Sequence, residues 1–128
     1  MKNDSDTTVQ ELKDMILQFS AERGWMEHHT PRSLAISISL EAAELLEHFQ
    51  WEDIKANTKE QMADEVADIL SYLLAFANAT DIDVATAYRA KLAKSAVKYP
   101  AEIFNEASLG REEYLAIKQA HRKAKGKQ

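Results

Sequence analysis

The sequence contains no cysteine among its 128 residues. This absence excludes a disulfide framework, a thiolate zinc site and a cysteine nucleophile. A chain without disulfides suits a reducing compartment, and we expect a cytoplasmic protein. The polar residues 1–6 are not followed by an apolar block, so we expect no signal peptide.

Glycine and proline are scarce as well, with three and two residues respectively. So few turn-forming residues argue against a β-sandwich or barrel and favour a few long helices. Hydrophobic residues make up 45% and charged residues 29%, which is too apolar for intrinsic disorder. We therefore expect an all-α, four-helix-bundle-like fold with an extra C-terminal helix and no sheet.

Long hydrophobic runs and an excess of positive charge are also missing. No stretch approaches the roughly 18 apolar residues of a membrane span, so we expect no membrane partner. Residues 1–110 carry 10 basic and 19 acidic side chains, whereas residues 111–128 carry six basic and two acidic ones. An acidic body disfavours nucleic acid as a partner, although an acidic site that holds divalent cations can bind phosphates.

Apolar spacing and capping signals predict where the helices lie. Two capping boxes occur at 8–11 and 58–61, and Thr30-Pro31 is typical of a helix start. Residues 34–40 alternate like a strand, but the helical pattern of 41–49 follows without a breaker, so we predict a helix through both. The predicted helices span 8–22, 31–50, 58–79, 84–97 and 110–125, with loops at 25–30 and 101–109.

The connections between these helices are short. We therefore expect a single domain over 1–128, with core helices in about 8–100 and a basic C-terminal helix at about 110–125.

Two carboxylate pairs carry the chemistry. Glu41-x-x-Glu44 and Glu65-x-x-Asp68 each place two acids on one helical face, at the border of an apolar stripe. If the two stripes pack together, the four carboxylates converge and must repel one another. A hard divalent cation such as Mg²⁺, which takes oxygen ligands and substrate phosphates, would relieve that repulsion. The arrangement suits phosphoanhydride hydrolysis by a metal-activated water.

Other interpretations remain open at this point. A single E-x-x-E pair is usually a solvated helix face, and the chain could be a non-enzymatic helical interaction module that its acids keep in solution. A di-iron site is disfavoured, because none of the four histidines has an acid three residues before it.

The ordered set of motifs resembles the MazG-like all-α nucleoside triphosphate pyrophosphohydrolases. Glu41-x-x-Glu44 and Glu65-x-x-Asp68 look like the family signature, and the surrounding segments follow in the family's order. These segments are ERGW at 22–25, HTPR at 29–32, EAAELLEHFQW at 41–51, EVADILSY at 65–72, and Lys91 to Pro100. The chain is most similar to the short bacterial members and their dCTP pyrophosphatase relatives.

The resemblance implies that a nucleoside triphosphate is cleaved to a monophosphate and pyrophosphate, for nucleotide-pool cleansing, by a homodimer or homotetramer. It implies Mg²⁺, with Mn²⁺ as a substitute ion, held by catalytic residues that are also the metal ligands, Glu41, Glu44, Glu65 and Asp68. It implies substrate binding by Trp25, His29, Trp51, Tyr72, Lys91, Ser95, Lys98 and Tyr99. Ser95 departs from the asparagine common in relatives, and related activities on dUTP or phosphoribosyl-ATP stay open.

Overall fold

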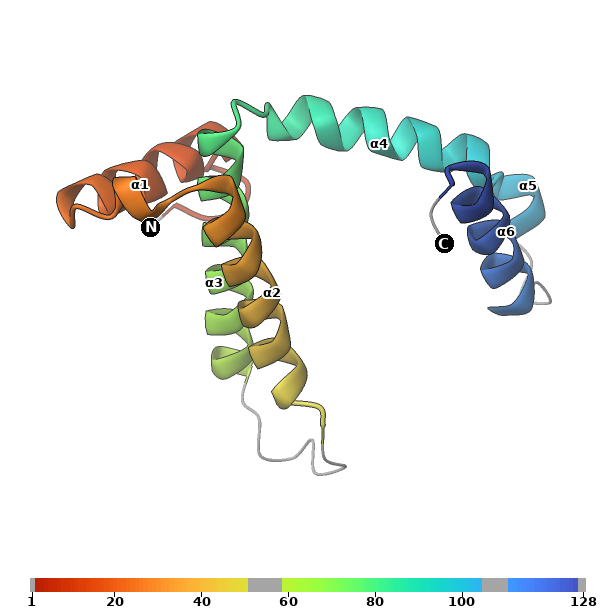
Figure 1. The fold of residues 1–128 in the computed structure, drawn as a ribbon, viewed down its shortest axis with the longest axis horizontal. Helices are drawn as coiled ribbons and strands as arrows, with labels where there is room; N and C mark the ends of the chain where they lie inside the picture. The colour runs from red at the N-terminus through yellow and green to blue at the C-terminus, as the bar shows by residue number, and fades with distance from the viewer. Residues whose placement is uncertain (1, 51–58, 105–110, 127–128) are drawn as a thin grey trace. The chain divides into compact units, whose positions relative to one another are not determined.

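A computed structural model describes residues 2–50, 59–104 and 111–126. Every regular element in these ranges is helical and none is a strand, so the all-α prediction is confirmed. Figure 1 labels the elements along the chain. They are α1 (Val9–Glu22), the 3₁₀ turn η1 (Met26–His28), α2 (Pro31–Glu47), α3 (Lys59–Ala79), α4 (Val84–Lys98), α5 (Ala101–Phe104) and α6 (Arg111–Ala124).

The chain divides into two compact units, Met1–Val84 and Ala85–Gln128. The first unit holds α1, η1, α2 and α3, and the second holds nearly all of α4 together with α5 and α6. That 1–128 forms one domain stays a prediction. No helix in the part of the chain that the structure describes is long and apolar enough to cross a membrane.

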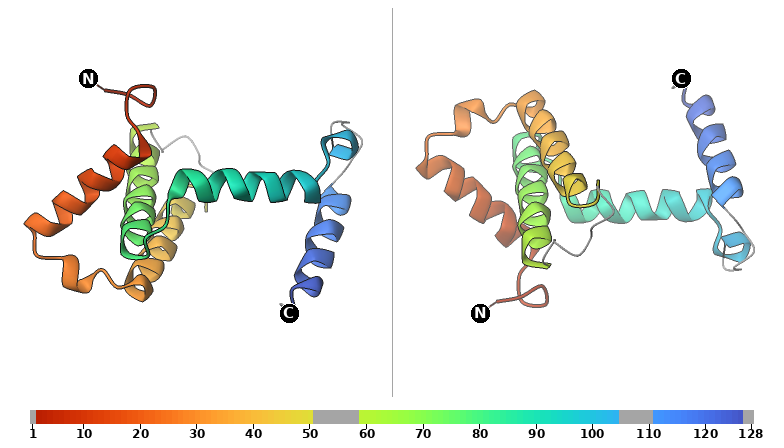
Figure 2. Two further views of the ribbon diagram at one scale, coloured as in Figure 1. Left: turned by 90° about the horizontal axis from the view of Figure 1, so that it is seen from above. Right: turned by 90° about the horizontal axis from the view of Figure 1, so that it is seen from below.

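Helix α3 organises the first unit. It packs against both α1 and α2, more extensively against α2, and lies between them (Figure 2). The described apolar side chains that are fully buried come from α2 and α3, namely Leu34, Leu74, Ala75 and Ala77. Two hydrogen bonds fix α1 to the end of α3, from Asn78 Nδ2 to the Lys13 carbonyl and from Lys13 Nζ to the Ile82 carbonyl, both 3.0 Å.

The helix starts follow the capping chemistry of the sequence. The Thr8 hydroxyl accepts from the Glu11 N–H at 3.1 Å, and the Thr8 N–H donates to the Glu11 carboxylate at 2.7 Å, which confirms the first capping box. Thr30 caps α2 through the Ser33 N–H, with Pro31 in the first turn. The second predicted capping box begins at Thr58, which lies outside the described residues.

The end of α2 was predicted too late along the chain. The helix ends at Glu47 rather than at residue 50, because the Phe49 and Gln50 N–H groups bond to the carbonyls of Leu46 and Glu47, three residues back. Such bonds tighten the last turn and end the α-helical register.

The second unit corrects the predicted loop at 101–109. Ala101–Phe104 forms the short helix α5, which starts directly after Pro100 and carries Glu102 in its first turn. The fixed φ of proline is compatible with a helical turn, and an acid in the first turn favours one. Tyr99 and Tyr114 stack with ring centroids 5.3 Å apart, which joins the end of α4 to α6.

Candidate active site

Three carboxylates from α2 and α3 converge. One oxygen from each of Glu41, Glu44 and Glu65 lies within 4.8 Å of the others. Glu41 and Glu44 are one helical turn apart on α2, and the side-by-side packing of α2 and α3 brings Glu65 to them (Figure 1). Unpaired anions this close repel strongly in a partly buried site.

Glu65 is partly buried in this cluster, with a side-chain exposure of 20%. Its Oε1 lies 3.3 Å from Nε2 of His48, the C-cap residue of α2. Its Oε2 is buried and has no hydrogen-bond partner among the described residues. A buried carboxylate oxygen left unpaired is costly, so this atom is free to ligate a cation.

The cluster raises the pKa of Glu41 above its ordinary value of 4.5. Partial burial is the largest cause, and the negative charges of Glu44, Asp68 and Glu65 add to it. Asp68 therefore lies within electrostatic reach of Glu41, although its carboxylate is outside the group of three that shares the 4.8 Å separation. The physical cause is the same for each neighbour, because a nearby anion disfavours a second one.

The donor set fits a hard divalent cation. All the converging atoms are carboxylate oxygens, one of them is buried and unpartnered, and no cationic side chain of Lys or Arg forms a described ion pair with the three acids. Mg²⁺, Mn²⁺ and Ca²⁺ prefer such oxygen ligands, whereas softer metals prefer thiolate and imidazole.

A pocket of about 390 Å³ opens beside this cluster, between α1, η1 and α3. Three predicted substrate-binding residues line it, Trp25, His29 and Tyr72, and so does Asp68. Tyr72 follows Asp68 by one turn of α3, so one helical face carries both an acid and an aromatic ring into the same pocket. The structure thus brings part of the predicted binding set next to one of the predicted metal ligands, Asp68.

The turn after α1 positions Trp25. The Trp25 N–H donates to the Ser20 carbonyl at 3.0 Å and the Gly24 N–H to the Ala21 carbonyl at 3.1 Å, which is a Schellman motif. Gly24 adopts φ +67°, a conformation that glycine takes without strain. The Trp25 ring then packs edge-on against Phe19, 5.7 Å between centroids.

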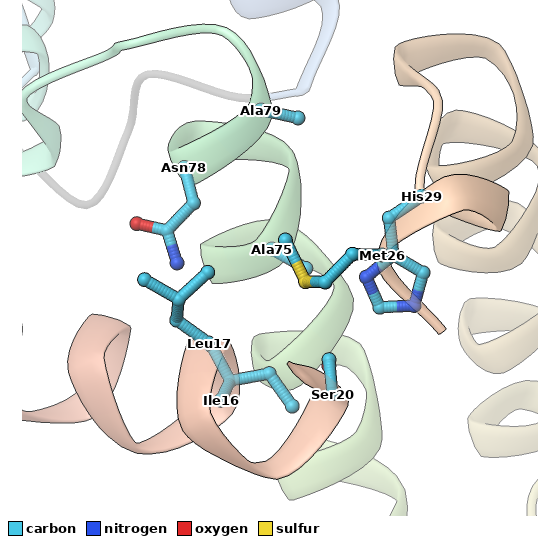
Figure 3. A pocket seen from close by; sticks show the side chains of 8 residues that line it. All are labelled: Ile16, Leu17, Ser20, Met26, His29, Ala75, Asn78 and Ala79. Atoms are coloured by element: carbon cyan, nitrogen blue, oxygen red, sulfur yellow. The ribbon is translucent and has the colours of Figure 1, made fainter. Parts of the chain in front are cut away.

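A second pocket of about 170 Å³ lies next to the first, and Figure 3 shows the side chains around it. The two pockets share Ile16, Ser20, His29 and Ala75. Of these four, Ser20 and Ala75 are not among the residues that the sequence singles out. Their signal is weak, because small and aliphatic residues at helical spacing are typical of any packed helix face.

The remaining predicted binding residues lie elsewhere. Lys91 and Ser95 are on α4, Lys98 is its last residue, and Tyr99 follows it, all in the second unit. Trp51 lies outside the described residues. Within the second unit, partial burial and then the charges of Lys98, Lys125 and Lys91 lower the pKa of His121, so cationic groups of α4 and α6 gather there.

Comparison with known proteins identifies a matching family and several similar proteins. A profile of the MazG-like family matches residues 36–109. The chain is 31% identical over 107 residues to the protein named dCTP pyrophosphatase 1 of Bos taurus, and the match covers 77% of this chain and 63% of that protein. It is 28% identical over 111 residues to the protein of the same name from Homo sapiens, covering 80% and 65%. The chain thus spans less than two thirds of the length of these relatives.

A solved structure is similar over nearly its whole length. The crystal structure of a pyrophosphatase from Archaeoglobus fulgidus superimposes with a TM-score of 0.67 and 37% identity, covering 78% of this chain and 99% of that one. The matched profile contains both carboxylate pairs. These findings agree with the resemblance drawn from the motifs, and the chain belongs to the MazG-like family.

Proposed function

We propose that the protein is a Mg²⁺-dependent nucleoside triphosphate pyrophosphohydrolase that converts a (d)NTP and water into a (d)NMP and pyrophosphate. The observation that carries the proposal is the convergence of Glu41, Glu44 and Glu65 beside an aromatic pocket that Asp68 also lines. Membership of the MazG-like family and the similarity to proteins named as pyrophosphatases support it.

The four acids would hold the metal. Glu65 offers a buried, unpartnered oxygen, Glu41 and Glu44 offer oxygens within 4.8 Å of it, and Asp68 joins them from the pocket side. Bound Mg²⁺ supplies charge neutralisation at phosphate oxygens and lowers the pKa of water. His48 orients Glu65 through its Oε1 atom and so leaves Oε2 available.

The pocket would hold the base and sugar. Trp25 and Tyr72 offer aromatic faces on which a base can stack, and the walls of the pocket exclude water from one side of the ligand. His29 adds a polar side chain, and Trp51 stays a proposed fourth contact. Lys91, Ser95, Lys98 and Tyr99 are proposed to bind the polyphosphate, in keeping with the cationic character of that part of α4 and α6.

We further propose a homodimer or homotetramer located in the cytoplasm. Several large apolar side chains of α2 and α3 are exposed in the single chain, including Ile36 (54%), Leu40 (58%) and Val66 (54%). We take these side chains to form the surface that a second subunit covers. Light scattering at micromolar concentration should give a multiple of 14.5 kDa, and a monomeric mass would contradict this part of the proposal.

The test is pyrophosphate release from a panel of nucleotides with Mg²⁺. The panel contains the canonical dNTPs, modified dNTPs, dUTP and phosphoribosyl-ATP, so it also distinguishes the related activities that the sequence left open. Glu44→Ala should lose most of the Mg²⁺-dependent turnover while keeping its helical circular dichroism. Asp64→Asn is the matched control, because Asp64 is exposed on α3 next to Glu65 but outside the cluster.

Two outcomes decide the matter. Release of pyrophosphate that depends on Mg²⁺ and on Glu44, but not on Asp64, supports the proposed enzyme. A non-enzymatic helical module would show no turnover on any nucleotide, and Glu44→Ala would change nothing or would raise stability by relieving repulsion.

A further inference from the structure

Ser20, in the last turn of α1, is the buried polar residue among the described residues of the first unit. Its relative exposure is 1%, less than that of any described apolar core residue except Leu34, which matches it. The Ser20 Oγ atom is buried and has no hydrogen-bond partner among the described residues. A hydroxyl removed from water without a partner destabilises the folded chain, so an unpaired one calls for an explanation.

Neighbouring helical hydroxyls behave differently. Ser39 donates to the Ala35 carbonyl at 3.2 Å, Ser71 to Ala67 at 2.8 Å and Thr80 to Phe76 at 2.7 Å. Each uses the carbonyl four residues back, which is the usual partner of a serine or threonine inside a helix. Ser20 makes no such bond in the described structure, so no hydrogen bond fixes its hydroxyl in one staggered rotamer. The oxygen is buried where it stands, and a change of rotamer would be needed to bring it to a ligand.

Ser20 lies in the wall that the two pockets share. Ile16 and Ala75, which share that wall, are apolar, so Ser20 and His29 are its two polar residues (Figure 3). Ile16 precedes Ser20 by one turn on the same face of α1. The larger pocket has further polar side chains outside this shared wall, Asp68, Ser71 and Tyr72, and the Ser71 hydroxyl is already bonded to the Ala67 carbonyl.

We propose that Ser20 is a specificity-determining residue whose hydroxyl forms a hydrogen bond with the polar edge of the nucleobase. The inference rests on the proposed function, because it takes the ligand of the pocket to be a nucleotide. A hydroxyl can both donate and accept a hydrogen bond. A base that places a hydrogen-bond donor or acceptor of its edge at Ser20 is therefore bound more tightly. A base with an apolar or mismatched edge there leaves the hydroxyl buried and unpaired.

The experiment compares wild type, Ser20→Ala and the control Ser39→Ala. Ser39 also lies within a helix, but it is exposed, lines neither pocket, and its hydroxyl is already bonded within α2. Steady-state kcat/KM is measured for the four canonical dNTPs with Mg²⁺. Binding of the four dNMPs is measured by calorimetry in EDTA, which does not depend on turnover or metal.

We expect Ser20→Ala to lose about tenfold in kcat/KM and in dNMP affinity for the preferred base, in line with one hydrogen bond. The other bases should change by about twofold or less, so that selectivity falls. The melting temperature of Ser20→Ala without ligand should equal or exceed that of wild type, because the variant removes an unpaired buried hydroxyl. Ser39→Ala should keep the wild-type order of bases.

Three results would overturn the inference. An unchanged order and strength of base preference in Ser20→Ala would show that the hydroxyl does not read the base. A melting temperature clearly below that of wild type would show that the hydroxyl has a structural partner. If the wild-type protein neither binds nor hydrolyses any nucleotide, the proposed function is wrong and the inference falls with it. The first two results differ from this one, because they concern Ser20 alone and leave the proposed function standing.

Discussion

His48 and Glu65 link the end of α2 to the second turn of α3, with 3.3 Å between Nε2 and Oε1. Both side chains are mostly buried, with exposures of 16% and 20%. The contact holds one oxygen of Glu65, and the other oxygen stays buried without a described partner beside Glu41 and Glu44. A side chain outside the three clustered carboxylates therefore determines how one of them is oriented.

Replacing His48 should destabilise the protein through Glu65. His48→Leu removes the contact to Oε1 of Glu65, whose Oε2 already has no described partner. We expect a loss of about 1–3 kcal/mol in the free energy of unfolding. His48→Gln can still donate to Oε1 and should recover part of the loss. Urea denaturation in EDTA measures both, and His28→Leu is the control, because His28 is exposed on η1. Equal losses at His48 and His28 would contradict the role of this contact.

Removing one charge from the cluster should have opposite effects with and without metal. In EDTA, Glu44→Gln should keep or raise the melting temperature, because the charge of Glu44 contributes to the raised pKa of Glu41. With Mg²⁺ at about 100 times its dissociation constant, wild type should gain about 2.7 kcal/mol, and Glu44→Gln should gain far less. Differential scanning calorimetry measures both states.

The control for this metal response is again Asp64→Asn, which removes the same charge from α3 outside the cluster. It should respond to Mg²⁺ as wild type does. A wild-type melting temperature that does not change between EDTA and millimolar Mg²⁺ would count against a metal at these carboxylates.

The sequence predicted the positions of the long helices and the spacing of the two acid pairs along them. Both follow from local rules, since capping boxes and helical periodicity act within a few residues, and the two E-x-x-E/D pairs share one spacing. The alternating stretch 34–40 is part of α2 because the neighbouring residues 41–47 continue the helix without a breaker. Local propensity and tertiary packing agree at these positions.

The resemblance predicted Trp25, His29 and Tyr72 as binding residues, but the rest of the pocket lining depends on how α1 crosses α3 and could not be predicted. Ile16, Ser20 and Ala75 become pocket walls only when those two helices pack, and nothing in their residue types marks them. The end of α2 and the short helix α5 were also mispredicted, because each is decided by one or two hydrogen bonds or by a proline at a helix boundary.

Acid should weaken the start of α1 through Glu11. The hydrogen bond from Lys2 Nζ, helped by those from Thr8, lowers the Glu11 pKa from 4.5 to about 2. Because the folded pKa is the lower one, the stabilisation is present above pH 4.5 and is lost as the pH falls towards 2. An NMR titration of the Glu11 carboxyl should give an apparent pKa of about 2, and Lys2→Gln should raise it. Lys94→Gln, on α4, should leave it unchanged, and an ordinary Glu11 pKa in wild type would contradict the capping geometry.

Gly24 should be the glycine on which the position of Trp25 depends. A Cβ at Gly24 would meet no atom within 4 Å, so Gly24→Ala has no clash and its cost is the backbone strain of φ +67°. We expect a loss of about 1–2 kcal/mol in the free energy of unfolding and an altered near-ultraviolet circular dichroism signal as the Trp25–Phe19 contact loosens. Gly126→Ala is the matched control, because Gly126 has φ +64° and equally open surroundings but follows α6 rather than the helix that leads into Trp25. A loss at Gly126 as large as the loss at Gly24, or no loss at Gly24, would show that the Schellman turn does not hold Trp25 in place.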